Sequence, residues 1–283
     1  MSTIDQFESV FRSSIKPSYE PNLIKFEKIL LVTDLEEEDE QRFLQDLMPL
    51  FTHLAGSGEL EVTQLPKAQS NDVQHLIDEV NQRSLDLVVT HRHLHSNRPL
   101  TYTLGDHIEV LTQVTNVPIL LFPHHSKKQD INFTLPDRVM VLTDQLDDHP
   151  GLIDAALTLV KEEGLISLAH IEDEAQYERY MNFISKIPEI DTQIARESIK
   201  SQIFKEAEDF VEVIKGTLQS RGLKVSVHSD IRMGHQLKTY VSMVELNHID
   251  MVVMQSKDDD QIAIHGLSYP LAVELSTLPL LIM

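Results

Sequence analysis

The sequence lacks cysteine altogether, and it is poor in basic residues and in long apolar runs. Without cysteine the chain has no disulfide framework, no thiol nucleophile and no thiolate metal site, which fits a reducing compartment. Its 24 Lys+Arg stand against 45 Asp+Glu, a formal net charge of −21, and the acidic side chains are spread over both halves. Because binding to nucleic acid or to an anionic membrane depends on clustered Lys and Arg, we expect neither as a partner.

The apolar runs are too short for a membrane span, which needs about 20 residues. The first 14 residues contain Asp5 and Glu8 and no continuous apolar stretch, so they do not resemble a signal peptide. We therefore predict a cytoplasmic protein. Its 283 residues are about twice the length of an average domain, which predicts two compact units.

An internal repeat divides the chain into two similar halves. The matched apolar segments are, in chain order, 28–34 with 138–144, 86–90 with 250–254, and 118–122 with 279–283. In each half a glycine, Gly105 or Gly266, stands 13 residues before the proline that leads the last apolar segment. The same order and the same spacing in both halves indicate that one structural unit occurs twice.

Continuous apolar strands that alternate with helical segments are typical of a parallel sheet with helices on both faces. We therefore predict an α/β protein made of two tandem doubly wound, Rossmann-like domains. The second half has the pattern of five strands and four helices, whereas the first half lacks one helix and one strand. The predicted units are an N-terminal arm (1–24), a shortened first domain (25–125), a polar linker (126–136) and a second domain (137–283).

Three segments are less regular than the rest. The N-terminal arm carries a short apolar stripe, and we expect it to dock as a helix. Residues 172–191 are acidic and contain aromatic side chains without a firm pattern, so we interpret them as a mobile excursion over the sheet edge. A long helix is predicted over about 194–219, and Leu223, Val225 and Val227 alternate as one face of the strand that follows it.

Together these features resemble the universal stress protein family in its tandem-domain form. The resemblance is carried by Asp34 and Asp144 at the end of the first strand of each half, by Leu168–Ile171, and by the matched Gly-helix-Pro-strand endings. It covers nearly the whole chain, about residues 25–123 and 137–283. It implies a doubly wound fold of the adenine nucleotide alpha hydrolase-like type and a role in stress resistance. It also implies ATP binding in many members and dimer contacts through the last strand.

The ATP-binding members of this family carry Gly-x2-Gly-x9-Gly-Ser/Thr after the fourth strand. The early glycines let backbone N–H groups approach phosphates, and the third glycine opens a helix whose start favours an anion. Here the two loops begin with His91–Leu94 and Gln255–Asp258, so only the third glycine, Gly105 or Gly266, survives in each half. In the second half the carboxylates of Asp258–Asp260 would repel phosphates.

In the first half Asp106 stands where a helix N-cap belongs, so we expect its side chain to occupy the N–H groups that an anion needs. ATP binding is therefore disfavoured, and we expect no cofactor. If a nucleotide does bind, the resemblance implies that Asp34, Gly105, Asp144 and Gly266 contact it. The alternative is that each aspartate simply caps the loop after its strand.

Three alternating histidines, His91, His93 and His95, are predicted to lie on the loop after the fourth strand, at the sheet edge where doubly wound folds bind ligands. Imidazoles suit Zn²⁺, Ni²⁺ or Cu²⁺, but Arg92 between them counts against a cation site. A solvated polar loop is the simpler interpretation, and we expect no metal. The sequence contains no P-loop, zinc-protease motif or hydrolase nucleophile motif, so we do not expect an enzyme.

The sequence thus predicts a tandem universal-stress-type protein that has lost the ATP-binding glycines and acts as a non-enzymatic stress-response or interaction module. The alternative is a sensor that binds ATP, another nucleotide or another small ligand at the carboxyl ends of the strands. The last strands of the two halves, 118–122 and 279–283, are the expected contacts. They would join a protein partner, a second chain in a homodimer, or the two halves in an internal pseudo-dimer.

Overall fold

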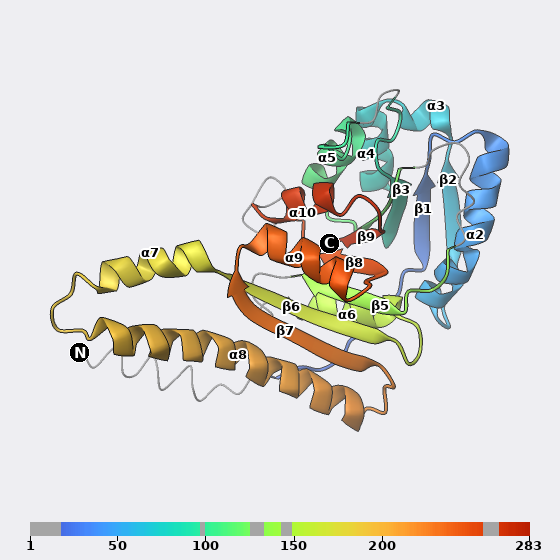
Figure 1. Ribbon diagram of the computed structural model, residues 1–283. Coiled ribbons are helices and arrows are strands. Elements are labelled where there is room, and N and C mark those ends of the chain that lie inside the picture. The colour runs from blue at the N-terminus through green and yellow to red at the C-terminus, as the bar shows by residue number, and fades with distance from the viewer. Residues whose placement is uncertain (1–17, 97–99, 125–132, 143–148, 257–265) are drawn as a thin grey trace.

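The computed structural model describes residues 18–96, 100–124, 133–142, 149–256 and 266–283. Helices cover both faces of one large, mainly parallel sheet, which confirms the predicted α/β fold class (Figure 1). The elements of the first half are β1 (Lys28–Val32), α2 (Glu37–Ala55), β2 (Glu61–Leu65), α3 (Lys67–Ser70), α4 (Val73–Gln82), β3 (Leu87–His91), α5 (Asp106–Val114) and β4 (Ile119–Phe122). The elements of the second half are β5 (Arg138–Leu142), α6 (Pro150–Leu159), β6 (Leu165–Asp173), α7 (Glu174–Ile184), α8 (Thr192–Ser220), β7 (Ser226–Gly234), α9 (Gln236–Leu246), β8 (Met251–Met254), α10 (Ser268–Glu274) and β9 (Leu280–Ile282).

The described strands follow the order β2-β1-β3-β4-β9-β8-β5-β6-β7 across the sheet. Neighbouring strands are parallel except β4 and β9, which are antiparallel with Leu120 opposite Leu281. In the second half the strand order reverses between β5 and β8, and in the first half it reverses between β1 and β3, as in doubly wound folds. The last strands of the two halves therefore pair with each other inside the chain.

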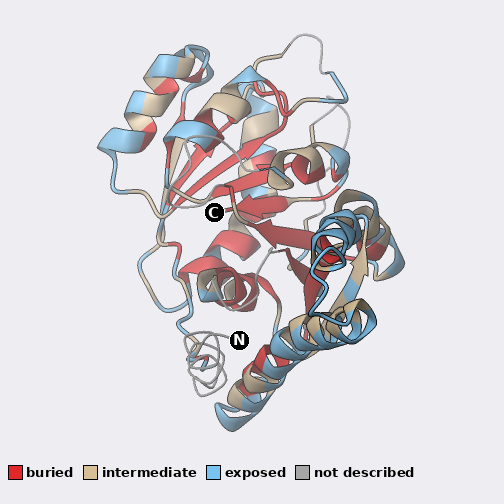
Figure 2. Ribbon diagram, turned by 90° about the vertical axis from the view of Figure 1, so that its left-hand side faces the viewer, coloured by how far each residue is buried: buried red, intermediate tan, exposed pale blue. Residues whose placement is uncertain are grey.

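The central strands are buried on both faces, and their successive residues point to opposite sides of the sheet. In β1, Ile29 and Leu31 face the core that contains residues of α2, α6 and α8, while Leu30 and Val32 face the core of α4, α5, α9 and α10. Figure 2 shows the strands buried between these helices. This two-sided cover explains why the central strands are continuous apolar runs, whereas the edge strands β2 and β7 contain many polar residues. None of the helices that the structure describes is long and apolar enough to cross a membrane.

The two halves also share a core beyond the sheet, since α2 packs against α6. The segment before β1 crosses to the second half, where the Tyr19 hydroxyl donates to Asp154 Oδ1 on α6 at 2.6 Å. The Tyr19 ring packs edge-on against Phe210 of α8. Residues 18–24 form no helix. The predicted helical docking of the arm rests on residues 1–17, which lie outside the described part of the chain.

Two details of the second half differ from the predictions. Residues 172–191 do have a regular pattern, because β6 runs directly into α7, where Asp173 caps the first turn by accepting two backbone N–H groups. The segment does leave the sheet at its edge, and its mobility stays a prediction. The strand predicted around 223–227 begins later and is longer, because β7 pairs along the whole of the nine-residue β6. The described end of the linker also joins the core, where Phe133 packs edge-on against Phe122 with ring centroids 5.4 Å apart.

Candidate functional site

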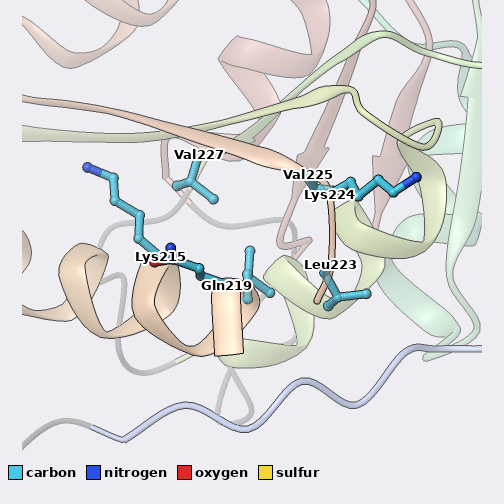
Figure 3. A pocket seen from close by; sticks show the side chains of 7 residues that line it. Lys215, Gln219, Leu223, Lys224, Val225 and Val227 are labelled. Atoms are coloured by element: carbon cyan, nitrogen blue, oxygen red, sulfur yellow. The ribbon is translucent and has the colours of Figure 1, made fainter. Parts of the chain in front are cut away.

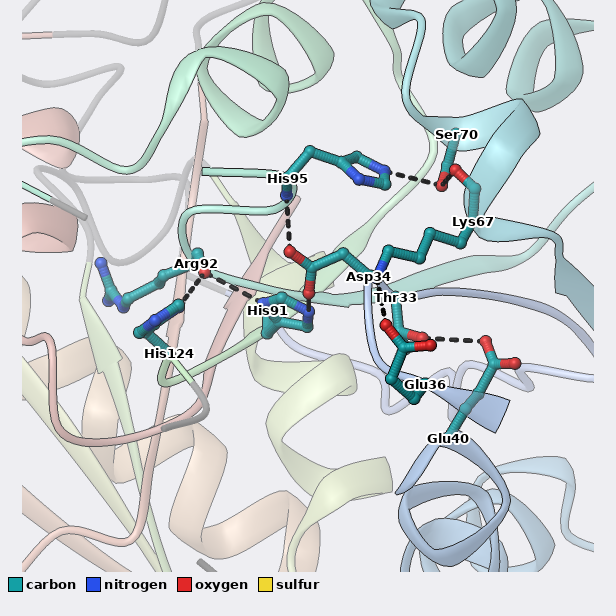
Figure 4. Close-up of polar contacts among 10 residues, drawn as sticks. All are labelled: Thr33, Asp34, Glu36, Glu40, Lys67, Ser70, His91, Arg92, His95 and His124. Carbon is teal, nitrogen blue, oxygen red and sulfur yellow. Dashed lines mark hydrogen bonds and ion pairs between the residues drawn. The ribbon is translucent and has the colours of Figure 1, made fainter. Parts of the chain in front are cut away.

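The candidate site lies where the first half reverses its strand order, the position at which doubly wound folds bind ligands. Asp34 follows β1 and His91 ends β3, so both side chains meet at the carboxyl edge of the sheet (Figure 4). His91 is 1% exposed, and the Asp34 side chain is 22% exposed. The predicted placement of His91 on a loop is wrong, because its backbone still pairs with Phe122 of β4.

Asp34 is held by two N–H groups of the chain itself. Its Oδ1 lies 2.9 Å from His91 Nε2, and its Oδ2 accepts a hydrogen bond from the backbone N–H of His95 at 2.9 Å. Burial would raise the pKa of Asp34, but the hydrogen bond and charge of His91, together with His95, hold it well below its usual range. The carboxylate is therefore ionised at neutral pH, with both oxygens engaged.

The loop after β3 keeps a glycine-like backbone without early glycines. His93 and His95 both have φ of 59°, in the left-handed region that residues other than glycine rarely adopt. Counted back from Gly105 by the spacing Gly-x2-Gly-x9-Gly, His95 stands at the second glycine position and Arg92 at the first. The His95 side chain contacts Ser70, with Nε2 2.8 Å from Oγ. An imidazole thus occupies a position that is left open when the residue is glycine.

Two imidazoles of this loop, those of His93 and His95, supply little positive charge at neutral pH. Burial, followed by the charge of His107, lowers the pKa of His95 to about 4, and the two rings lie 5.0 Å apart. Burial and then the charge of His124 also lower the pKa of His93. Both His93 and His95 are therefore neutral at pH 7 and offer little attraction to a phosphate.

Close packing requires glycine at position 105. Gly105 has φ of 95°, and a Cβ there would lie 2.7 Å from the Cα of His93. Gly105 is also the N-cap of α5, and no side chain caps this helix end. The prediction that Asp106 is the N-cap is therefore wrong, because Asp106 is already the first helical residue. It stands with Glu109 in the first turn, where two carboxylates disfavour an incoming phosphate.

The three alternating histidines are directed to different partners. His91 faces Asp34, the His93 ring lies 5.6 Å from that of His124, and His95 points toward α3. Within the described ranges, no group of three or more His, Asp or Glu side chains is placed to hold an ion. Alternating residues share a face on a regular strand, but the left-handed residues of this loop turn their side chains apart.

Arg92 links the loop to the second half, a role that the sequence did not reveal. It is 1% exposed, and its Nη2 donates to the backbone oxygen of Leu275 at 2.9 Å. Burial lowers the pKa of Arg92 to about 10, so the guanidinium stays charged at neutral pH. The backbone oxygen of Arg92 lies 3.0 Å from His91 Nδ1 and 3.1 Å from His124 Nδ1 (Figure 4). Arg92 therefore joins the loop to the second half through its side chain and to His91 and His124 through its backbone oxygen.

The matching site of the second half falls largely outside the described residues. Asp144 and Asp258–Asp260 belong to that part, so the predicted repulsion of phosphates there stays a prediction. Gly266 is described, and a Cβ at this position would meet no atom within 4 Å. Close packing therefore requires glycine at Gly105 but not at Gly266.

Two grooves lie away from this site. One of about 300 Å³ runs between the end of α8 and the segment that leads into β7 (Figure 3). Lys224 on its wall is paired with Glu162 at 3.0 Å. The other, of about 550 Å³, lies at the amino ends of β1, β3 and β4 and includes Met283. Neither groove includes Asp34 or His91, which lie at the carboxyl edge of the sheet.

No protein-family model and no curated protein matches the sequence. Among solved structures, a universal stress protein from Archaeoglobus fulgidus matches with a TM-score of 0.51 at 14% identity, covering 92% of this chain and 97% of that protein. A putative universal stress protein from Pseudomonas aeruginosa matches with a TM-score of 0.49 at 12% identity, covering 100% of this chain and 88% of its own. The first match confirms the predicted resemblance at the level of the fold: this chain has the fold of the universal stress proteins.

Proposed function

We propose that the protein is a non-enzymatic, cytoplasmic stress-response and interaction module of the universal-stress type, whose first-half crevice does not take a triphosphate. The observation that carries this proposal is the carboxylate of Asp34. Its two oxygens are used by His91 and by the backbone N–H of His95, each at 2.9 Å. The residue that would contact a nucleotide therefore stabilises the chain's own loop instead.

Local charge supports the same proposal. A phosphate at a helix start depends on free N–H groups and on a favourable local charge. Helix α5 instead has Asp106 and Glu109 in its first turn. At a separation of ~5 Å and an effective dielectric of about 20, one carboxylate–phosphate pair costs roughly 3 kcal/mol. Arg92 does not offset this repulsion, because its side chain is directed to Leu275.

The polar contacts beside the crevice favour a non-enzymatic role. Ser70 Oγ and His95 Nε2 lie 2.8 Å apart, a separation typical of a nucleophile and its base. Ser70, however, is fully buried, and its hydroxyl also donates to the backbone oxygen of Lys67 at 3.3 Å. With a pKa of about 4, His95 is a weak base at neutral pH. The pair therefore suits a structural contact better than proton transfer.

Nucleotide binding by the full chain tests this proposal. We expect the melting temperature to be the same with and without ATP and Mg²⁺, whereas a ligand at about 100 times its Kd would add about 2.7 kcal/mol of stability. We also expect phosphate release to equal that of a heat-inactivated sample. A rise in melting temperature that Asp34→Asn abolishes would overturn the proposal. A rise that survives Asp34→Asn would favour the alternative, a nucleotide sensor that uses the second half.

A further inference from the structure

Helix α7 and the first part of α8 form a helical hairpin that projects from the edge of the sheet (Figure 1). We call residues 174–209 the arm. The fully buried residues of α8 begin only at Phe210, where the helix reaches the body of the protein. The arm therefore extends away from the shared core and exposes both of its helices to solvent (Figure 2).

The arm is held together by contacts of its own. The Tyr177 hydroxyl on α7 donates to the backbone oxygen of Arg196 on α8 at 2.6 Å. The Arg196 guanidinium lies over the Tyr177 ring and donates through Nη2 to Glu178 Oε2 at 2.9 Å. Asp191 caps α8 by accepting two backbone N–H groups. None of these contacts uses the exposed apolar side chains at the end of the arm.

Large apolar side chains gather in the turn that joins the two arm helices and in the helix ends beside it. We call them the tip patch: Tyr180 (54% exposed), Phe183 (54%), Ile187 (43%), Ile190 (41%) and Ile194 (64%). These five residues are half of the exposed large apolar side chains in the described part of the chain, and they fall within 15 residues of sequence. Exposed apolar side chains concentrated on one short, projecting segment indicate a binding surface.

The area of the tip patch matches one side of a dimer interface. The five side chains expose roughly 500 Å². A stable protein interface buries about 800 Å² on each partner, of which about 57% is apolar. The tip patch thus supplies about the apolar area that one partner contributes, and the polar residues of the arm around it would form the rim.

The low net charge of the segment around the tip patch indicates which partner binds there. Residues 174–196 hold the tip patch and contain three basic and four acidic side chains, close to neutrality, whereas the whole chain carries −21. Two copies of so acidic a protein repel each other over most of their surfaces but little at this segment. A membrane or a nucleic acid would need a basic cluster. We propose that the tip patch binds the tip patch of a second copy, so that two chains associate arm to arm around a two-fold axis.

Analytical ultracentrifugation of the full chain tests this assignment. We expect the wild-type protein to approach twice the chain mass of 32.3 kDa as concentration rises. The variant Phe183→Glu/Ile194→Glu places two charges in each tip patch and should weaken dimerisation at least tenfold. Leu246→Glu is the matched control, because Leu246 is 75% exposed on α9 and lies outside the arm. Its dimerisation should equal that of the wild type.

The absence of cysteine allows a direct test of the contact. Ser185→Cys places a single thiol beside the tip patch, and the exposed Ser220→Cys places one at the far end of α8. Under mild oxidation the first variant should form covalent dimers much faster than the second. A wild-type protein that stays monomeric would overturn the proposal. So would a dimer that Phe183→Glu/Ile194→Glu leaves unchanged while circular dichroism shows an intact fold.

Discussion

Replacing Asp34 with asparagine tests whether the carboxylate at the first-half crevice stabilises the fold. Asp34 accepts one hydrogen bond from the imidazole of His91 and one from the backbone N–H of His95, both at 2.9 Å. Asparagine keeps one acceptor oxygen, so one of these donors would face an NH₂ group. Since a hydrogen bond to a charged group contributes about 1.5–3 kcal/mol, we expect Asp34→Asn to lower the free energy of unfolding by about 2–3 kcal/mol at pH 7.

The matched control is Glu36→Gln, which removes the same charge two residues away. Glu36 is 78% exposed and pairs with an exposed lysine, so we expect its loss to cost less than about 0.5 kcal/mol. Urea unfolding of both variants gives the comparison. A cost for Asp34→Asn equal to that of Glu36→Gln would refute the argument and leave Asp34 available to a ligand.

The pH dependence of the Asp34→Asn effect has a defined sign. The folded-state pKa of Asp34 lies well below its usual range, because the contacts with His91 and His95 outweigh burial. The stability from the carboxylate is therefore fully present above its unfolded pKa of about 3.9 and is lost as the pH falls toward the folded value. The difference between the wild type and Asp34→Asn should stay large between pH 7 and 5 and narrow below about pH 4.

Three further changes test the loop and the contact between the halves. The pKa of His95 is lowered to about 4 in the folded protein, so the unfolded chain binds a proton at this residue at a higher pH than the folded chain does. The wild type should therefore lose about 1–2 kcal/mol of stability between pH 6.5 and 4. Asparagine tolerates positive φ, so His95→Asn should reduce that loss, as measured by urea titrations at both pH values. Tyr19→Phe removes the 2.6 Å hydrogen bond to buried Asp154 and should cost about 1.5–3 kcal/mol at pH 7 in urea unfolding. Burial raises the pKa of Asp154, so this cost should shrink as the pH falls and the carboxyl takes up a proton. Gly105→Ala would place a Cβ 2.7 Å from a backbone carbon and should lower the free energy of unfolding by at least about 2 kcal/mol. The control is Gly216→Ala, which lies in open space on α8 and should stabilise the protein by about 0.5–1 kcal/mol. Thermal unfolding of both variants gives the comparison.

The sheet could be predicted because its strands are apolar on both faces and the pattern occurs twice. The predicted segment 86–90 differs from β3 by one residue at each end, and the predicted segment 250–254 differs from β8 by one residue at its start. Helix α7 could not be predicted in the same way. Part of its apolar surface faces α8 and part faces solvent, so its apolar side chains do not line a single stripe. The signals in the sequence that mark the starts of the two arm helices are their N-cap residues, Asp173 and Asp191.

The place of the candidate site could be predicted, but its bonding could not. The repeat places Asp34 and His91 at the ends of strands that lie side by side, so their proximity follows from the fold. The direction of His95 depends on a left-handed backbone, and no glycine marks that conformation in the sequence. The partner of Arg92 lies 183 residues away and enters only when the two halves pack together.

The residues that carry the family resemblance in the first half each have a local structural reason to be present. Asp34 satisfies two N–H donors, one from a nearly buried imidazole, and leaving such donors unpaired would cost stability. Gly105 is required because any side chain would clash with the backbone at His93. Neither residue therefore argues for a bound nucleotide. At Gly266 a Cβ would meet no atom of the described residues within 4 Å, so packing against that part of the chain does not explain the glycine. The second-half crevice is predicted to repel phosphates through Asp258–Asp260, and ligand-induced stabilisation that survives Asp34→Asn is the result that would contradict this prediction.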